Sequence, residues 1–423
     1  MKPILYLSKG LVFLTFVLGL STFTSQAQNT YTEYKGIVID QNSQKALESV
    51  NISIKNTNIA TFTNTEGTFI LKVPKDTKEE IVIFSLLGYD TKEVRLKMLS
   101  GENNTIELSF KIIELPQVNV TQFKDAEALV RKVFENKAKN NLDEPVLMTV
   151  FYRETIKKRN RNVSLTEAVI DLFKQSYLNR SRDVMTINKA RKSTDYRRLD
   201  TLAIKLQGGP FSTLYLDIMK YPEYLFVDEL AEGYDYTFDP PTMVNNKLVY
   251  VVGFVKKPDD EPLGYYGKLY IDANSLALAG AEYALNVEDK RRASDVFVKK
   301  KPRDVVAYPT EASYKVSYKE KNGKWYHSYG SVDLTFKVDK KGRLFNTLYT
   351  VSCEMAVTDW ETTTASKNMG MLKDRLRPSI IIADAVSGFS DPDFWGAYNL
   401  IEPDKSIESA IEKIRKNLKR EIQ

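Results

Sequence analysis

Few residues of this 423-residue chain have the types and spacing that enzyme active sites need. The sequence holds one histidine, His327, and one cysteine, Cys353. A Ser-His-Asp triad would have to use His327, and no Gly-x-Ser-x-Gly elbow is present to supply its serine. Cys353 lies in the alternating run RLFNTLYTVSCEMAV, which predicts a buried strand position rather than a nucleophile. We therefore predict that the protein is not an enzyme.

Two pairs of oxygen-bearing side chains could bind a metal or cleave a glycosidic bond. Asp272 and Asn274 could give calcium two ligands, but the loop lacks the further carboxylates and the closing glutamate of such sites, so a tight turn is favoured. Asp391 and Asp393 could be the carboxylates of a glycoside hydrolase, but the proline between them indicates a loop with no fixed separation. We expect no metal and no cofactor, and a carbohydrate-active hydrolase is the third of three functional hypotheses.

One strand carries the residues that we select as a candidate ligand face. Asn-Gly at 322–323 predicts a hairpin within a meander of strands at 309–320, 324–338 and 343–358. In the middle strand, strict alternation would put Trp325, His327 and Tyr329 on one face, opposite the apolar residues of the other face. We predict this face as the ligand site; the alternative is ordinary strand aromatics that pack under a helix or loop.

The start of the chain predicts export. Two lysines precede an apolar run at 11–20 and a small-residue exit at Ser25-Gln26-Ala27, the order of a signal peptide spanning residues 1–27. A run of about ten apolar residues is half the length that a membrane-spanning helix needs, so no transmembrane segment is expected after cleavage. Removing two lysines lowers the formal charge from +6 to +4, which is too diffuse to indicate a nucleic-acid partner. We expect a periplasmic or outer-membrane-associated protein.

Residues 31–112 have the pattern of a small β-sandwich. Val50, Ile52 and Ile54 alternate with Asn51, Ser53 and Lys55, and similar runs recur downstream between turn signals rich in glycine, asparagine and proline. About seven short strands without a helical pattern predict an antiparallel sandwich.

Four spaced motifs in this region carry a family resemblance. Gly36-x-Val38-x-Asp40, Leu47-x-x-Val50-x-Ile52, Thr63-Asn64-x-x-Gly67-x-Phe69 and Phe84-Ser85-x-x-Gly88-Tyr89 resemble the carboxypeptidase-regulatory-like domain, a transthyretin-like sandwich of Bacteroidetes envelope proteins. Ala46 and Ser49 depart from it, where that family often has proline and glycine. The resemblance implies a module that supports or presents a neighbour. It does not imply a carboxypeptidase, because zinc there needs two histidines and this chain has one.

The rest of the chain predicts a larger, β-rich α+β domain at 123–423, joined by a linker at 113–122. Apolar residues at helical spacing between Ala126 and Ala138 predict a first helix, and those between Ile407 and Leu418 a terminal amphipathic helix at 404–421. Strands are expected at 247–255, 264–272 and 276–286. A basic band between Arg153 and Arg198 is expected to be a solvated face rather than a lipopolysaccharide site. The predicted fold class is mainly β, with flanking helices around the larger sheet.

Two further resemblances bear on function. Strands at 265–272 and 276–286 resemble paired strands of LolA-like lipoprotein carriers, whose curved sheet cradles acyl chains, and 391–403 resembles the close of uncharacterised Bacteroidetes envelope proteins. The leading hypothesis is a non-catalytic exported envelope protein, in which the sandwich supports a sheet domain that binds a ligand or partner. The alternative is a LolA-like carrier of a lipid or lipoprotein. An envelope protein, a glycan or a lipid is therefore the expected partner.

Overall fold

The computed structural model describes most of the chain. The described residues are 30–110, 123, 125–159, 161–194, 208–226, 233–244, 247–258, 263–298, 303–342, 345–362, 373–382, 395–405, 407–409 and 411–412. The predicted signal peptide at 1–27 and linker at 113–122 lie outside them, and both stay predictions. Of the terminal helix expected at 404–421, the described part begins at Asp404, whose Oδ1 accepts from the backbone N–H of Ile407 at 2.8 Å. No helix in the described residues is long and apolar enough to span a membrane.

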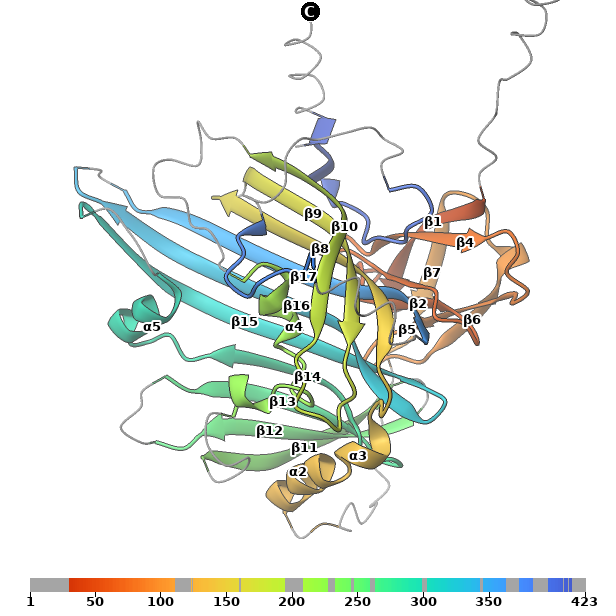
Figure 1. The fold of residues 1–423 in the computed structure, drawn as a ribbon, viewed down its shortest axis with the longest axis horizontal. Helices are drawn as coiled ribbons and strands as arrows, with labels where there is room; N and C mark the ends of the chain where they lie inside the picture. The colour runs from red at the N-terminus through yellow and green to blue at the C-terminus, as the bar shows by residue number, and fades with distance from the viewer. Residues whose placement is uncertain are drawn as a thin grey trace, which may run out of the picture.

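The N-terminal part is the predicted seven-stranded sandwich (Figure 1). One sheet has the order β4-β1-β7, with strands Thr68–Pro74, Tyr31–Asp40 and Asn104–Leu108. The other has the order β3-β2-β5-β6, with strands Ala60–Phe62, Asn51–Ile54, Ile81–Ser85 and Lys92–Arg95, and a 3-10 turn η1 (Leu96–Met98) follows. One pair differs from the antiparallel expectation, since β7 runs parallel to β1. Between β6 and β7 the chain crosses from one sheet to the other. Strand β7 therefore lies beside β1 and runs in the same direction as β1.

The alternation of apolar and polar residues explains why the two faces of β2 have different surroundings. Val50, Ile52 and Ile54 are buried in the sandwich core with apolar residues of the opposite sheet. Asn51 and Ser53 point the other way, as period-two geometry requires. Ser53 is nevertheless buried, because the outer face of β2 is covered by the rest of the protein. This polar face becomes one wall of the site described below.

The larger part is one ten-stranded sheet with the order β10-β9-β8-β17-β16-β15-β14-β13-β12-β11. Its strands are β8 (Val146–Lys158), β9 (Arg161–Lys174), β10 (Val184–Thr194), β11 (Tyr234–Val244), β12 (Lys247–Lys256), β13 (Tyr265–Asp272), β14 (Leu278–Leu285), β15 (Val305–Lys321), β16 (Lys324–Lys340) and β17 (Thr347–Thr362). All neighbours are antiparallel, which confirms the predicted larger antiparallel sheet. Asn322 and Gly323 both have positive φ at the β15–β16 turn, as a two-residue hairpin requires.

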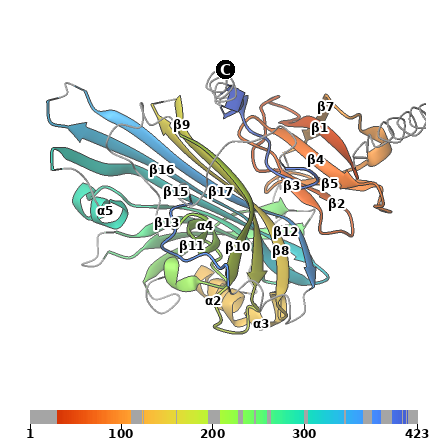
Figure 2. The ribbon, with the colours of Figure 1, turned by 45° about the horizontal axis from the view of Figure 1, so that its top comes forward.

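Short helices cover one face of this sheet. Asp125 caps α2 (Ala126–Glu135) by accepting from the backbone N–H of Ala128 at 2.6 Å, and Leu129, Val130 and Val133 form its buried stripe. The predicted helix is interrupted at Asn136, after which α3 (Lys137–Asn140) follows. α4 (Pro210–Leu214) and the 3-10 turn η2 (Pro222–Tyr224) lie in one segment, residues 208–226, while α5 (Lys290–Phe297) packs on β15. Figure 2 shows the sandwich to one side of the large sheet and α4 within its curve.

Candidate functional site

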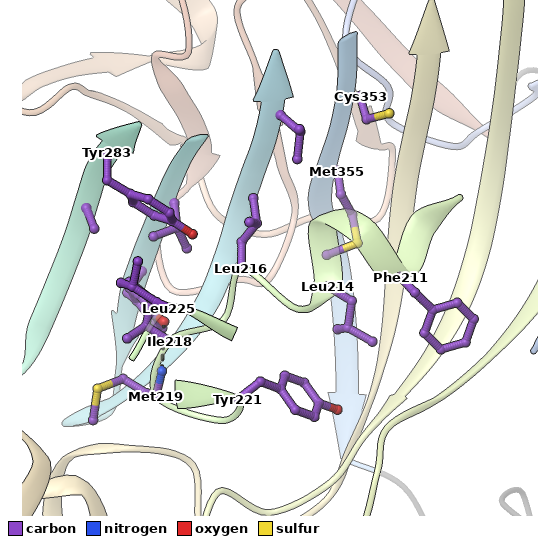
Figure 3. Close-up of a cluster of buried hydrophobic side chains, with 14 of the residues drawn as sticks. Phe211, Leu214, Leu216, Ile218, Met219, Tyr221, Leu225, Tyr283, Cys353 and Met355 are labelled. Carbon is purple, nitrogen blue, oxygen red and sulfur yellow. Dashed lines mark hydrogen bonds between the residues drawn. The ribbon is translucent and has the colours of Figure 1, made fainter. Parts of the chain in front are cut away.

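The large sheet has an inner face, which carries Val332, Leu334 and Phe336, and an outer face toward the sandwich. Residues 208–226, here called the covering segment, lie on the inner face and belong to its hydrophobic core. Figure 3 shows their side chains against strand residues of the sheet: Phe211, Leu214, Leu216, Ile218, Met219, Tyr221 and Leu225 lie close to Tyr283, Cys353 and Met355. Cys353 is buried, as the sequence predicted. In the described residues, the hollow of the sheet is therefore occupied by the protein's own chain.

A buried charge network anchors the covering segment to the sheet. Asp217, which has 0% exposure, accepts from Lys174 Nζ at 2.6 Å, from the Tyr177 hydroxyl at 2.8 Å and from the Tyr318 hydroxyl at 2.9 Å. Lys174 Nζ also pairs with Asp183 at 2.7 Å. Burial alone would raise the pKa of Asp217, but the Lys174 ammonium and the donated hydrogen bonds hold that pKa below its usual value. The segment is thus tied down by a desolvated ion pair as well as by apolar contact.

His327 lies beside this network and is enclosed. Its backbone N–H donates to the Tyr177 hydroxyl at 3.1 Å, and its ring lies 6.0 Å from that of Tyr318. Burial lowers the pKa of His327 to about 4, so the imidazole is neutral at pH 7. Its Nε2 is buried and has no hydrogen-bond partner in the described residues. A substrate would have to displace the covering segment to reach it.

The three predicted face residues do not share a face, because a β-bulge interrupts the alternation. The β15–β16 register pairs Ser317 with Tyr329 but the next residue, Tyr318, with His327, so Ser328 is an extra residue. His327 therefore faces inward, whereas Tyr329 faces outward and contacts Phe62 of the sandwich at a ring distance of 5.0 Å.

Trp325 packs in the inner core, where its carbonyl accepts from the backbone N–H of Leu142 at 3.3 Å. The bulge separates Tyr329 from Trp325 and His327, so the prediction that all three share one face is wrong. All three side chains are buried. A role for any one of them in ligand binding stays a prediction.

Two arginines of the predicted basic band are buried rather than solvated. Arg153 donates from Nε to Glu167 at 2.9 Å, and Arg191 donates from Nε to the other oxygen of the same carboxylate at 2.7 Å. Arg153 also pairs with Glu354 at 3.0 Å and donates to the carbonyl of Ile401 at 2.6 Å. One signal in the sequence could have indicated these buried charges. Arg153 and Glu167 each interrupt a long run of strand residues that is otherwise largely apolar.

Residues 395–402 bind the sandwich to the outer face. Asn399 accepts from the backbone N–H of Lys72 at 2.7 Å and donates to its carbonyl at 3.0 Å, as a strand partner would. The Thr61 hydroxyl donates to the carbonyl of Leu400 at 2.8 Å. Trp395 packs edge-on against Phe151 of β8 at a ring distance of 5.9 Å. The sandwich is therefore held by backbone-directed hydrogen bonds as well as by apolar packing.

A pocket of about 350 Å³ lies between the sandwich and the outer face, on the side of β12–β16. The sandwich wall contributes the outward residues of β2 and β5, among them Asn51, Ser53 and Ser85. The sheet wall contributes the outward residues of β13 to β15, which include Tyr270, Asp272, Glu282, Lys315, Ser317 and Lys319. Neither part alone forms this pocket. Trp325, one of the three predicted ligand-face residues, also lines this pocket. The pocket as a whole was not expected from the sequence, because it depends on how two separately folded layers meet.

Among the described residues, one lysine that lines this pocket has no ion pair. Lys315 pairs with Glu282 at 3.2 Å, and Lys247 pairs with Glu320. Lys319 has no ion pair or hydrogen bond to its side chain in the described residues. Burial lowers the pKa of Lys319 to about 8, with a smaller contribution from a neighbouring lysine. The ammonium therefore predominates at pH 7 and can hold an anion.

Asp272 forms the turn that the sequence predicted. Its Oδ1 accepts from the backbone N–H of Asn274 at 3.2 Å and of Ser275 at 2.7 Å. Its Oδ2 is buried at the pocket wall and has no hydrogen-bond partner in the described residues. No group of three or more His, Cys, Asp or Glu side chains in the described residues is placed to hold a metal ion. Asp391 and Asp393 lie outside the described residues.

Comparison with protein families identifies the N-terminal part. Residues 34–120 match the family model of the CarboxypepD_reg-like domain. This confirms the resemblance drawn from the four motifs. A comparison with curated proteins gave no match.

Solved structures similar to the chain are weak neighbours. A LolA superfamily protein, NE2245 from Nitrosomonas europaea, is 8% identical, with 58% of this chain and 97% of that chain covered at a TM-score of 0.23. A DUF1329 family protein from Desulfovibrio piger is 10% identical over 56% and 92% of the two chains, at a TM-score of 0.22. A lipovitellin structure is 6% identical over 53% and 26%, at a TM-score of 0.23. Likenesses at this level carry no argument about function.

Proposed function

We propose that the protein is a non-catalytic exported envelope protein, periplasmic or associated with the outer membrane, that binds a ligand between its two parts. The observation that carries this proposal is the pocket of about 350 Å³ whose walls come from both parts. Its volume falls in the range of about 300–1,000 Å³ typical of small-molecule sites. A pocket with an uncompensated ammonium at Lys319 is costly unless an anion or water satisfies it.

The sandwich serves as a brace in this proposal. It supplies the hydroxyl-rich wall through β2 and β5, and residues 395–402 fix its position on the sheet through Asn399 and the Lys72 backbone. A rigid wall lowers the entropic cost of binding, because the site is already ordered before the ligand binds. This agrees with a supporting role for the CarboxypepD_reg-like domain and needs no peptidase chemistry.

The enclosed state of the usual catalytic groups supports a binding protein over an enzyme. His327 is neutral and covered by the segment 208–226, and Cys353 is buried, where burial raises the pKa of its thiol and disfavours the nucleophilic thiolate. Hydrolysis of a peptide, ester or glycan panel by the purified protein, abolished by His327→Gln or Asp391→Asn, would overturn this conclusion and favour the hydrolase hypothesis.

Native mass spectrometry of the protein isolated from its own cell envelope tests the proposal. We expect a bound mass on the wild-type chain that is absent from Ser317→Trp, whose indole would fill the pocket. Glu311→Trp is the matched control, since Glu311 is exposed on the same strand and outside the pocket. Absence of any bound mass from the wild-type chain, or retention of that mass by Ser317→Trp, would contradict the proposal.

A carrier of a lipid or lipoprotein is the second candidate, favoured by the apolar lining of the inner face. An acyl chain could take the place of the covering segment, because that segment contributes its own apolar side chains to the same core. In that case the bound mass would be that of an acyl ligand, Ser317→Trp would keep it, and residues 208–226 would become sensitive to protease when the ligand is present. None of these outcomes is expected for a ligand in the pocket between the two parts.

A further inference from the structure

We infer that the ligand of the pocket between the sandwich and the sheet is a small polyhydroxylated monoanion. The anionic group would lie at Lys319, and its hydroxyl groups would face the polar wall of the sandwich. This inference rests on the proposed function and adds the chemical class of the ligand.

The charge of the ligand follows from the pairing of the pocket's ionic groups. In the described residues, Lys315 and Lys247 are paired with Glu282 and Glu320, and Lys319 is the lining ammonium without an ion pair. The Oδ2 of Asp272 at the same wall also lacks a hydrogen-bond partner there and would accept from a hydroxyl of the ligand. A ligand with two or more negative charges would leave the excess charge beside these glutamates, where it is repelled. A single carboxylate is therefore the anion that fits, because a phosphate monoester carries about 1.5 to 2 negative charges at pH 7.

The hydroxyl content of the ligand follows from the sandwich wall. The side chains of Asn51, Ser53, Ser85 and Ser317 line the pocket and make no side-chain hydrogen bond in the described residues. Hydroxyl and amide groups both donate and accept, so they match a ligand that presents several groups of the same kind. An unbranched acyl chain would leave all four unsatisfied, at a cost of about 1–3 kcal/mol for each buried group.

The size and apolar parts of the pocket narrow the class further. The volume of about 350 Å³ is close to the lower limit for small-molecule sites, which suits one or two sugar-sized rings and excludes a long polymer within the pocket. Phe62, Leu87 and Tyr270 also line it and can contact the C–H faces of such a ring. A sugar acid has this chemistry, and the experiment compares it with a sugar phosphate, which carries more negative charge.

Isothermal titration of the purified full chain with four probes tests the inference. D-glucuronate and D-glucose 6-phosphate carry the hydroxyls and an anion, D-glucose lacks the anion, and acetate lacks the hydroxyls. We expect glucuronate to bind at least tenfold more tightly than glucose and acetate. Tighter binding of glucose 6-phosphate than of glucuronate would contradict the single negative charge, because the phosphate carries about 1.5 to 2 charges at pH 7.

Lys319→Met should weaken binding of glucuronate by about 10- to 100-fold, the range of a charge-assisted hydrogen bond. Lys268→Met is the matched control, because Lys268 lies on β13, two strands from β15 in the same sheet, pairs with Asp239 at 2.8 Å and does not line the pocket. Its affinity should stay within twofold of the wild type. Ser53→Ala should weaken glucuronate more than acetate, since only the former has hydroxyls to lose.

Measuring the affinity for the anion at a series of pH values distinguishes a binding role of Lys319 from a merely structural one. The affinity for the anion should be constant below the Lys319 pKa of about 8 and fall above it, as the ammonium loses its proton. Lys319→Met should show no such fall. The other charged groups that line or adjoin the pocket are Lys247, Lys315, Lys321, Glu93, Glu282, Glu320 and Asp272. All of them remain in Lys319→Met, so a fall that persists there would belong to them and contradict the inference.

The outcomes separate this inference from the proposed function. Equal binding of glucose and the two sugar anions, or unchanged binding by Lys319→Met, would overturn the inference. A bound mass in native spectra that Ser317→Trp removes, with no binding of either anion, would also overturn it while leaving the proposed function in place. No bound mass on the wild-type chain would contradict both.

Discussion

Replacing Lys174 by methionine would remove the cation from a pair of buried carboxylates. Lys174 Nζ lies 2.7 Å from Asp183 and 2.6 Å from Asp217, and the side chains of all three residues are at most 1% exposed. Methionine keeps most of the side chain's volume, so the change is mainly one of charge. The covering segment carries Asp217, and its attachment to the sheet should weaken first.

The expected loss follows from the burial of the network. Removing one partner of a buried ion pair costs about 3–5 kcal/mol, because the remaining charge is left in a low-dielectric site. Asp217 keeps its hydrogen bonds from two tyrosine hydroxyls, which puts the expected loss toward the lower end of this range. We therefore expect Lys174→Met to lower the free energy of unfolding by about 3 kcal/mol at pH 7.

The destabilisation by Lys174→Met should depend on pH, and the pKa of Asp217 gives the direction of that dependence. In the wild type, the pKa of Asp217 lies below its unfolded value, so its contribution to stability is present above about pH 4 and is lost as the pH falls through the folded pKa. Without Lys174, burial dominates and raises that pKa above the unfolded value. The contribution of Asp217 is then lost as the pH rises through the folded pKa. The difference between the two proteins should accordingly shrink as the pH is lowered toward about 4.

Urea unfolding at a series of pH values, with limited proteolysis of residues 208–226, measures both effects. Lys132→Met is the control, since Lys132 is 46% exposed on α2 and pairs with Glu135, and exposed pairs contribute about 0.2–1 kcal/mol. The double variant Lys174→Met with Asp217→Asn should recover part of the loss, because one uncompensated charge disappears. A loss below about 1 kcal/mol, or a difference that does not depend on pH, would refute the reasoning.

Three further substitutions test the fold and its buried charges, each by urea unfolding. Glu167→Gln should cost about 3–5 kcal/mol, since it leaves Arg153 and Arg191 buried without their shared carboxylate, and a near-neutral result would contradict that network. Gly267→Ala should cost about 1–3 kcal/mol, because its methyl carbon would lie 2.3 Å from a carbonyl oxygen of β14; an unchanged midpoint would contradict the close strand approach. Asp125→Ala should cost about 1 kcal/mol through loss of the α2 cap, and no loss would show that the cap is not formed.

Local patterns predicted much of the fold, because they act through neighbours in the sequence. The alternation of Val50, Ile52 and Ile54 identified a strand with one buried face, and the structure confirms it. Asn322-Gly323 specified a hairpin through backbone conformations that few other residue pairs adopt. These signals need no knowledge of distant parts of the chain.

The candidate site was less predictable, because it depends on a bulge and on long-range packing. One extra residue at Ser328 reversed the face of every residue before it in β16, so His327 and Tyr329 were wrongly placed together. No sequence pattern distinguishes Lys319 from the other lysines of the strands. Its special position arises when the sandwich closes over it, and no spacing in the sequence encodes that contact.

Buried charges were missed for a related reason. Lysine and arginine are normally exposed, so a basic band predicts a solvated surface. Arg153 and Arg191 are buried because Glu167, on the strand between theirs, meets both. Such compensation can be found only once the order of the strands is known.

A crystal structure of the protein isolated from its own envelope with its ligand retained tests the proposed binding mode most directly. We expect ligand density between β2 and β5 of the sandwich and β13 to β15 of the sheet, with an anionic group within hydrogen-bond distance of Lys319 Nζ. The covering segment should remain in place, with Asp217 paired to Lys174. Ligand density on the inner face with residues 208–226 displaced, or no density between the two parts, would contradict it.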